Sequence, residues 1–77
     1  TIRDAEIIEV IPTEHSQATQ KSLRELDIPP GIVIGSIVHQ GRIIVPRGDT
    51  IIHPHDHVII FALKSVVPVV EKLFDKK

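Results

Sequence analysis

Four stretches of the chain carry apolar residues in patterns that fit strands. Residues 5–11 alternate between two faces, while residues 32–39, 42–45 and 56–63 are short apolar runs next to turn-forming residues. A period of two, or a run of about four to eight apolar residues between turn signals, is typical of strands. The run at 32–39 is apolar on both faces, which predicts a strand buried on both sides. Residues 51–53 form a further short extended piece.

Helical periodicity follows the first strand. Thr19, Leu23 and Leu26 share one face at i, i+4 and i+7, and Ser16 or Thr19 stands where an N-cap is expected. The Pro-Pro-Gly run at 29–31 cannot continue a helix. The pattern therefore predicts a short, weakly amphipathic helix that ends before this run.

The last apolar segment predicts a second helix with a full apolar stripe. The stripe falls at i, i+3, i+4, i+7 and i+8 and comprises Val66, Val69, Val70, Leu73 and Phe74. Ser65 stands at the expected N-cap, and Pro68 lies in the first turn, where a missing N–H costs little. Val67 lies off the stripe, so we expect it to add to the exposed apolar surface.

The turns between these segments indicate how they connect. Gln40-Gly41 is a tight hairpin signal between two strands, and Arg47-Gly48-Asp49-Thr50 forms a polar turn. The element order is then β-α-β-β-β-α. This order predicts the α+β class, with a small, mainly antiparallel or mixed sheet of about four strands covered on one face by two helices.

Composition adds the expectation of a partner. The chain has 77 residues, with 14 Ile and 9 Val but no Cys, so no disulfide can staple it. We interpret residues 1–77 as a single domain cut from a longer chain. A domain of this size buries only about 60% of the surface that its unfolded chain exposes. A surplus of apolar surface on a small domain predicts a homodimer, with twofold symmetry as the expected arrangement.

Charge and motifs argue against two classes of function. Lys+Arg number 9 and Asp+Glu 10, and aromatic residues make up 3% of the chain, so we expect no binding to a nucleic acid polymer. The nearest approach to a nucleophile elbow, Ile34-Gly35-Ser36-Ile37, lacks the second Gly. We therefore expect no enzymatic activity.

Three motifs occur in a characteristic order. Residues 22–31 read S-L-R-E-L-D-I-P-P-G, residues 41–50 read G-R-I-I-V-P-R-G-D-T, and residues 54–61 read P-H-D-H-V-I-I-F. The first is similar to the helix and turn of the TrkA C-terminal (RCK C-lobe) domain family. The second resembles that family's G-x-x-I-x-P-x-G-D-T, and the third its x-P-G-D-x-V-x-V. The resemblance spans nearly the whole chain and implies an RCK C-lobe fold.

The resemblance also implies a function. Domains of this family are regulatory, dimerising parts of TrkA, a cytosolic gating subunit of potassium uptake systems at the inner face of the cell membrane. The implied partners are the rest of the TrkA chain and a membrane channel subunit of the TrkH or TrkG type. Two alternatives stay open: a purely structural dimerisation module, or the same domain attached to a cation–proton antiporter or a carboxylate carrier.

Ligands implied by the resemblance fall into two groups. NAD(H) or ATP/ADP belongs to a Rossmann-like lobe, whose Gly-x-Gly-x-x-Gly is absent from this chain, so we expect no cofactor in this domain. Some related RCK proteins bind cyclic di-AMP at the dimer interface, which makes it a candidate ligand here.

Candidate ligand-binding residues are His39, Arg42, Pro46 and Arg47. Arg42 and Arg47 flank one strand and could bind a phosphate or carboxylate. The alternative is that they lie at a solvated hairpin edge and bind no ligand. His39 stands where the family often has Arg, which removes a permanent cation from this region.

His53, His55 and His57 are the candidate metal ligands. At i, i+2 and i+4 they would share one face of an extended segment and, with Asp56, would suit Zn²⁺, Ni²⁺ or Cu²⁺. Pro54 and the expected turn break that geometry. We therefore favour a polar turn in which Asp56 is structural, with no metal bound.

Overall fold

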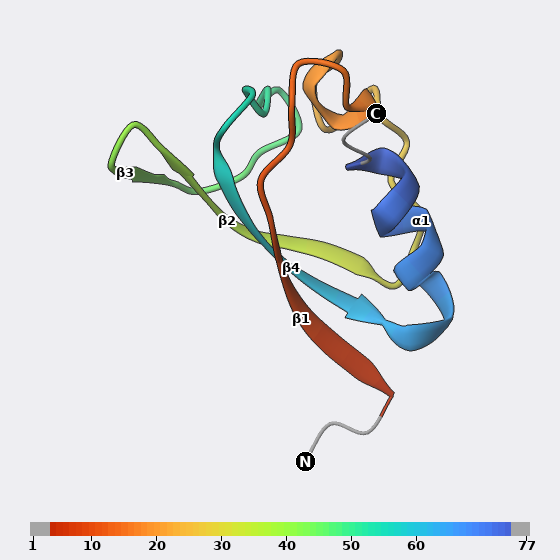
Figure 1. Ribbon diagram of the computed structural model, residues 1–77. Coiled ribbons are helices and arrows are strands. Elements are labelled where there is room, and N and C mark those ends of the chain that lie inside the picture. The colour runs from red at the N-terminus through yellow and green to blue at the C-terminus, as the bar shows by residue number, and fades with distance from the viewer. Residues whose placement is uncertain (1–3, 75–77) are drawn as a thin grey trace.

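The computed structural model describes residues 4–74, in which four strands form one antiparallel sheet (Figure 1). Its spatial order is β1-β4-β2-β3, and every neighbouring pair is antiparallel. The strands are β1 (Ala5–Val10), β2 (Ile32–His39), β3 (Arg42–Ile44) and β4 (His57–Leu63). The predicted α+β class and four-stranded sheet are confirmed.

The two faces of the sheet differ in what covers them. Along β4, Val58, Ile60 and Ala62 are buried, while Phe61 and Leu63, which point to the other side, are exposed. The prediction that residues 32–39 are buried on both sides is wrong, because Val33 is 60% exposed. Its neighbour across the sheet is Phe61, which lies on the same open face.

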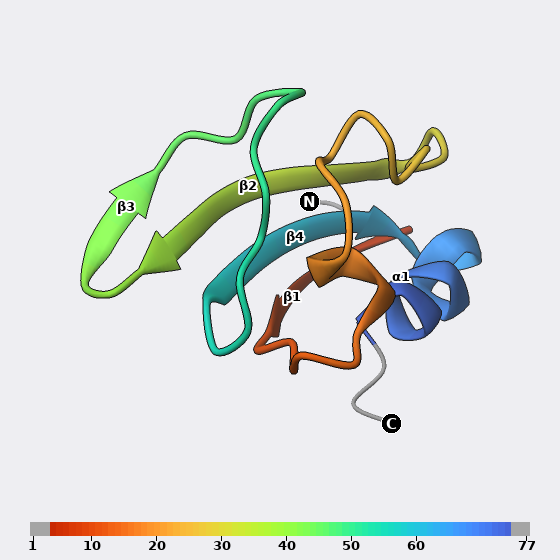
Figure 2. The ribbon, with the colours of Figure 1, turned by 90° about the horizontal axis from the view of Figure 1, so that it is seen from above.

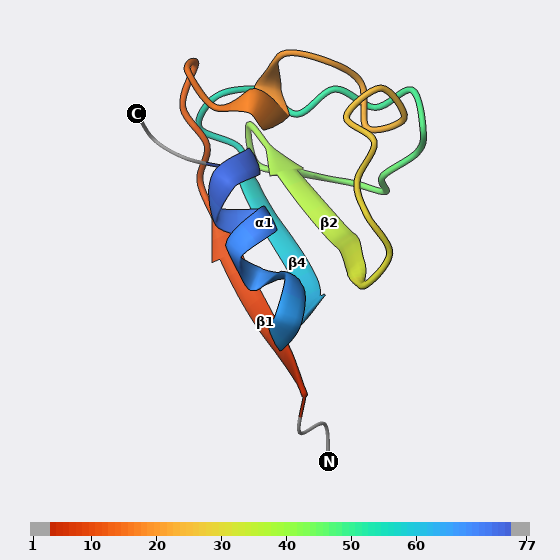
Figure 3. The same ribbon diagram turned by 90° about the vertical axis from the view of Figure 1, so that its right-hand side faces the viewer.

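One α-helix covers the opposite face of the sheet. It is α1 (Val67–Leu73), preceded by the 3-10 turn η2 (Lys64–Val66), and it lies across β4 (Figure 3). Pro68 falls in its first turn as expected, but Ser65 lies within η2 and makes no cap. Val67 packs against the core, so the expectation that it adds to the exposed apolar surface is wrong.

The predicted first helix is a 3-10 turn, η1 (Gln17–Thr19), followed by a series of turns (Figure 2). The backbone N–H groups of Leu23 and Arg24 donate to the carbonyls of Thr50 and Gly48, both at 2.9 Å, and not to carbonyls four residues back. Contact with a distant loop therefore outcompetes the helix. The expectation of two covering helices is corrected to one helix and η1.

Two glycine positions shape the sheet. Gln40 and Gly41 have φ angles of 49° and 80°, as the two-residue turn between β2 and β3 requires. Gly35 lies at a register shift between Ile34 and Ser36, where a Cβ atom would collide with the Phe61 ring. No helix in the described part of the chain is long and apolar enough to cross a bilayer.

Candidate functional site

An exposed apolar row crosses three strands of the open face. Ile7 on β1 and Val33 on β2 both stand opposite Phe61 on β4. These side chains are 70%, 60% and 43% exposed, in that order, and Leu63 beside them is 47% exposed. A contiguous apolar patch of this kind on a small domain is typical of a protein–protein interface. We call Ile7, Val33, Phe61 and Leu63 the open-face row.

A pocket of about 450 Å³ lies between β2, the turns that follow η1 and the loop at 46–48. It is lined by Leu23, Arg24, Ile28, Ile32, Ile34, Pro46, Arg47 and Gly48. The guanidinium groups of Arg24 and Arg47 lie beside isoleucine side chains in this pocket. Such a lining suits a ligand that carries both an anionic group and an apolar part. The structure thus brings together Pro46 and Arg47 of the predicted site.

Arg24 is the charged pocket residue that the sequence did not predict. Its backbone N–H donates to the Gly48 carbonyl, and a side chain at position 48 would collide with its guanidinium. An isolated bridge between Ser22 and Ile51 holds the two segments together. The only signal in the sequence is that both segments belong to motifs of the same family pattern.

His39 and Arg42 lie apart from this pocket. They face each other across the turn between β2 and β3, and Arg42 is exposed. His39 instead directs Nδ1 to Oδ1 of Asp56 at 2.6 Å. The four residues predicted to bind a ligand are therefore divided between two places.

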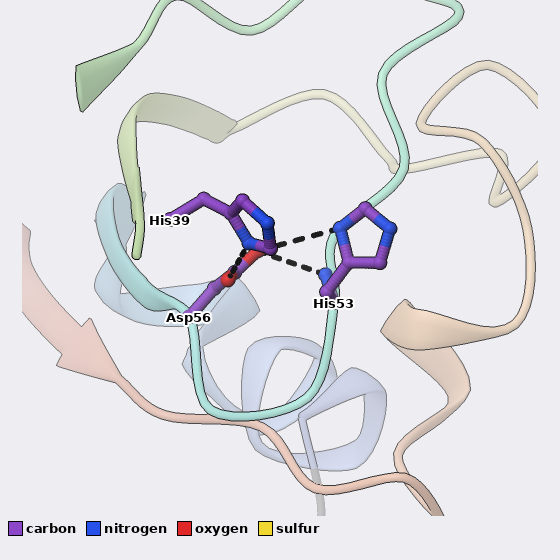
Figure 4. A group of neighbouring side chains, drawn as sticks. All are labelled: His39, His53 and Asp56. Carbon is purple, nitrogen blue, oxygen red and sulfur yellow. Dashed lines mark hydrogen bonds and ion pairs between the residues drawn. The ribbon is translucent and has the colours of Figure 1, made fainter. Parts of the chain in front are cut away.

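Asp56 is the centre of a small polar cluster (Figure 4). Its side chain is 3% exposed, and its Oδ2 accepts a hydrogen bond of 2.9 Å from the His53 backbone N–H. The His53 ring directs Nδ1 to the same oxygen at 3.9 Å, and its centroid lies 4.8 Å from that of His39. Two imidazoles thus converge on one buried carboxylate.

The predicted trio of histidines does not gather in the described part of the chain. His57 pairs with Glu9, with Nδ1 and Oε2 3.0 Å apart. His55 is exposed, with a positive φ of 72°, and its backbone N–H donates to the Pro12 carbonyl. Of the three, His53 alone lies in the cluster with His39 and Asp56.

Comparison with known proteins assigns the chain to a family. The profile of the TrkA-C domain matches residues 7–75. The chain belongs to the TrkA-C domain family. A Trk system potassium uptake protein, TrkA homolog 2 of Methanosarcina mazei, is 46% identical over 70 residues. A TrkA homolog of Pyrococcus abyssi is 35% identical over 74 residues.

The TrkA-C domain matches only part of each relative. The aligned region covers 91% of this chain but 16% of the M. mazei protein, and 95% of this chain but 33% of the P. abyssi protein. The chain therefore corresponds to a domain that its relatives carry within longer proteins.

Solved structures share the fold. The RCK_C domain dimer of S. agalactiae BusR in complex with c-di-AMP superposes with a TM-score of 0.76 at 28% identity, covering 95% of this chain and 94% of that one. An RCK domain solved with cda gives a TM-score of 0.69 at 22% identity, covering 90% and 97%. The RCK C-lobe architecture implied by the motifs is confirmed.

Proposed function

We propose that this TrkA-C domain is a regulatory dimerisation module of a potassium uptake system and that the open-face row forms its dimer interface. The observation that carries the proposal is the row Ile7, Phe61 and Val33, which runs across three strands and stays exposed. The BusR domain, which shares the fold, is a dimer. Burying this row against a second copy removes apolar surface from water, which favours association.

The wider setting is supported by the relatives, which are Trk system potassium uptake proteins. In this proposal the domain acts on the cytoplasmic side of the membrane, together with the rest of a TrkA chain and a channel subunit of the TrkH or TrkG type. It acts by shifting a conformational equilibrium and performs no catalysis. A ligand moves such an equilibrium only by its differential affinity for the two states.

Variants of the open face test the dimer. Val33→Lys places a charge at the β2 end of the row, where burial in an interface would be costly. Val69→Lys is the matched control, since Val69 is 36% exposed on α1, over the opposite face. We expect sedimentation equilibrium to show at least about a tenfold weaker dimer for Val33→Lys and an unchanged dimer for Val69→Lys. Equal effects of the two variants would contradict the interface.

The ligand proposal is narrower: the domain senses an anionic ligand of the cyclic di-AMP class. Support comes from the two guanidinium groups of the pocket and from the BusR domain solved in complex with c-di-AMP. A bound ligand raises the melting temperature by linkage. We expect cyclic di-AMP to raise it in the wild-type chain and Arg47→Gln to reduce the shift.

The thermal-shift measurements distinguish two binding places for the ligand, and they distinguish a ligand-sensing domain from a purely structural one. If Arg42→Gln abolishes the shift and Arg47→Gln does not, the ligand binds at the β2–β3 turn and the pocket assignment is wrong. If cyclic di-AMP gives no shift in a chain that is dimeric, the purely structural module is the better description.

A further inference from the structure

The cluster of His39, His53 and Asp56 has the donor set of a transition-metal site. Each residue offers one ligand atom, and these atoms lie within 4.8 Å of one another. Two imidazole nitrogens and a carboxylate oxygen form a set that suits Zn²⁺ and its neighbours, whereas Mg²⁺ and Ca²⁺ prefer oxygen ligands alone. We propose that these three residues bind one Zn²⁺ ion per chain, with solvent in the remaining position.

The spacing of the donors fits a tetrahedral ion after small movements. Metal–ligand bonds of about 2.0–2.1 Å place tetrahedral donors about 3.3 Å apart. Here Nδ1 of His39 lies 2.6 Å from Oδ1 of Asp56, and Nδ1 of His53 lies 3.9 Å from Oδ2, the other oxygen of the same carboxylate. The two imidazoles must therefore move so that both approach an ion held by one of these oxygens. Both rings can turn, because the His39 and His53 side chains are 30% and 56% exposed.

The carboxylate is held in place for such a role. Asp56 is buried, and the His53 backbone N–H donates to its Oδ2, so the acceptor keeps its orientation when the rings move. Among the described residues, the side chains beside the Asp56 carboxylate are these two histidines, and no Lys or Arg pairs with it. The cation that balances the buried carboxylate can therefore be a metal ion. Partners that fix a ligand in this way raise metal affinity.

Metal binding here would join two parts of the fold that are distant in sequence. His39 is the last residue of β2, just before the turn to β3, while His53 and Asp56 lie in the loop that leads into β4 (Figure 4). A bound ion would fix this loop to the base of the β2–β3 hairpin. An ion that binds the folded chain but not the unfolded chain stabilises the folded state.

The test uses the untagged 77-residue chain stripped with EDTA. We expect titration calorimetry to show that one Zn²⁺ ion binds per chain. We expect added Co²⁺ to show the strong visible absorption of a tetrahedral site. At about a hundredfold excess over Kd, Zn²⁺ should raise the melting temperature by about 10 °C or more, while Mg²⁺ should leave it unchanged.

Two histidine variants decide whether this cluster is responsible. His53→Gln removes a ligand but keeps the backbone N–H that supports Asp56, so the chain should fold in EDTA and bind Zn²⁺ at least about tenfold more weakly. His57→Gln is the control, because His57 pairs with Glu9 outside the cluster, and it should bind like the wild type. No Zn²⁺ stabilisation of the wild type, or equal binding by His53→Gln and the wild type, would overturn the proposal.

Discussion

Asp56 is the residue on which the loop before β4 depends. Its buried carboxylate accepts a hydrogen bond from the His53 backbone and pairs with His39. A buried acceptor of this kind satisfies groups that would otherwise lose their hydrogen bonds to water. The sequence predicts its structural role in a turn, and the structure adds that His39 is its partner.

Asp56→Ala should therefore destabilise the fold. Removal of the carboxylate leaves the His53 N–H without its partner and breaks the link to β2, which should cost about 2–3 kcal/mol. Asp49→Ala is the matched control, since Asp49 is an exposed residue of another turn and should cost less than about 0.5 kcal/mol. Urea unfolding measures both, and similar losses for the two variants would contradict the role of Asp56.

The His39–Asp56 pair shows why a site is harder to predict than a strand. The two residues are 17 positions apart, and the register that sets Val38 opposite His57 brings them together. That register includes a shift at Gly35; a glycine inside a strand is a signal for a bulge but does not specify which strand pairs with it. Local spacing therefore indicates the three neighbouring histidines as the candidate ligands, and of these only His53 lies in the cluster.

At the scale of elements, strands were predictable because their signals are local. The alternation in β1, the apolar runs of β2 and β4, and the Gln40-Gly41 turn each lie within one segment. The first helix was not predictable in this way. In this segment the backbone N–H groups of Leu23 and Arg24 donate to carbonyls of the 48–50 loop. The Ser22 backbone N–H and hydroxyl donate to the nearby Glu25 carboxylate. Those Ser22 bonds also lower the pKa of Glu25 from its ordinary value.

The contact between Gly35 and Phe61 gives a prediction for the sheet. An added methyl group in Gly35→Ala must displace the Phe61 ring, so we expect a loss of about 1–3 kcal/mol in the free energy of unfolding. Ser36→Ala, one residue along β2, adds no atom and serves as control. If Gly35→Ala is as stable as Ser36→Ala in urea, the ring does not lie across Gly35 in solution.

On the scale of the whole molecule, one face of the sheet has a covering layer and the other has none within the described residues. The core formed on the covered side includes Ile37, Val58, Ile60 and Val70. The open-face row has the same kind of side chains without a covering element. The sequence predicted a surplus of apolar surface, but it placed part of that surplus on the last helix, whereas the structure places this row on β1, β2 and β4.

The mass of the wild-type chain in solution shows whether the domain dimerises. Light scattering during size-exclusion chromatography, repeated over a wide range of loading concentrations, distinguishes one copy from two. We expect a particle of twice the 8.6 kDa chain mass that dissociates only on dilution. A mass of one chain at every concentration would contradict dimerisation through the open-face row.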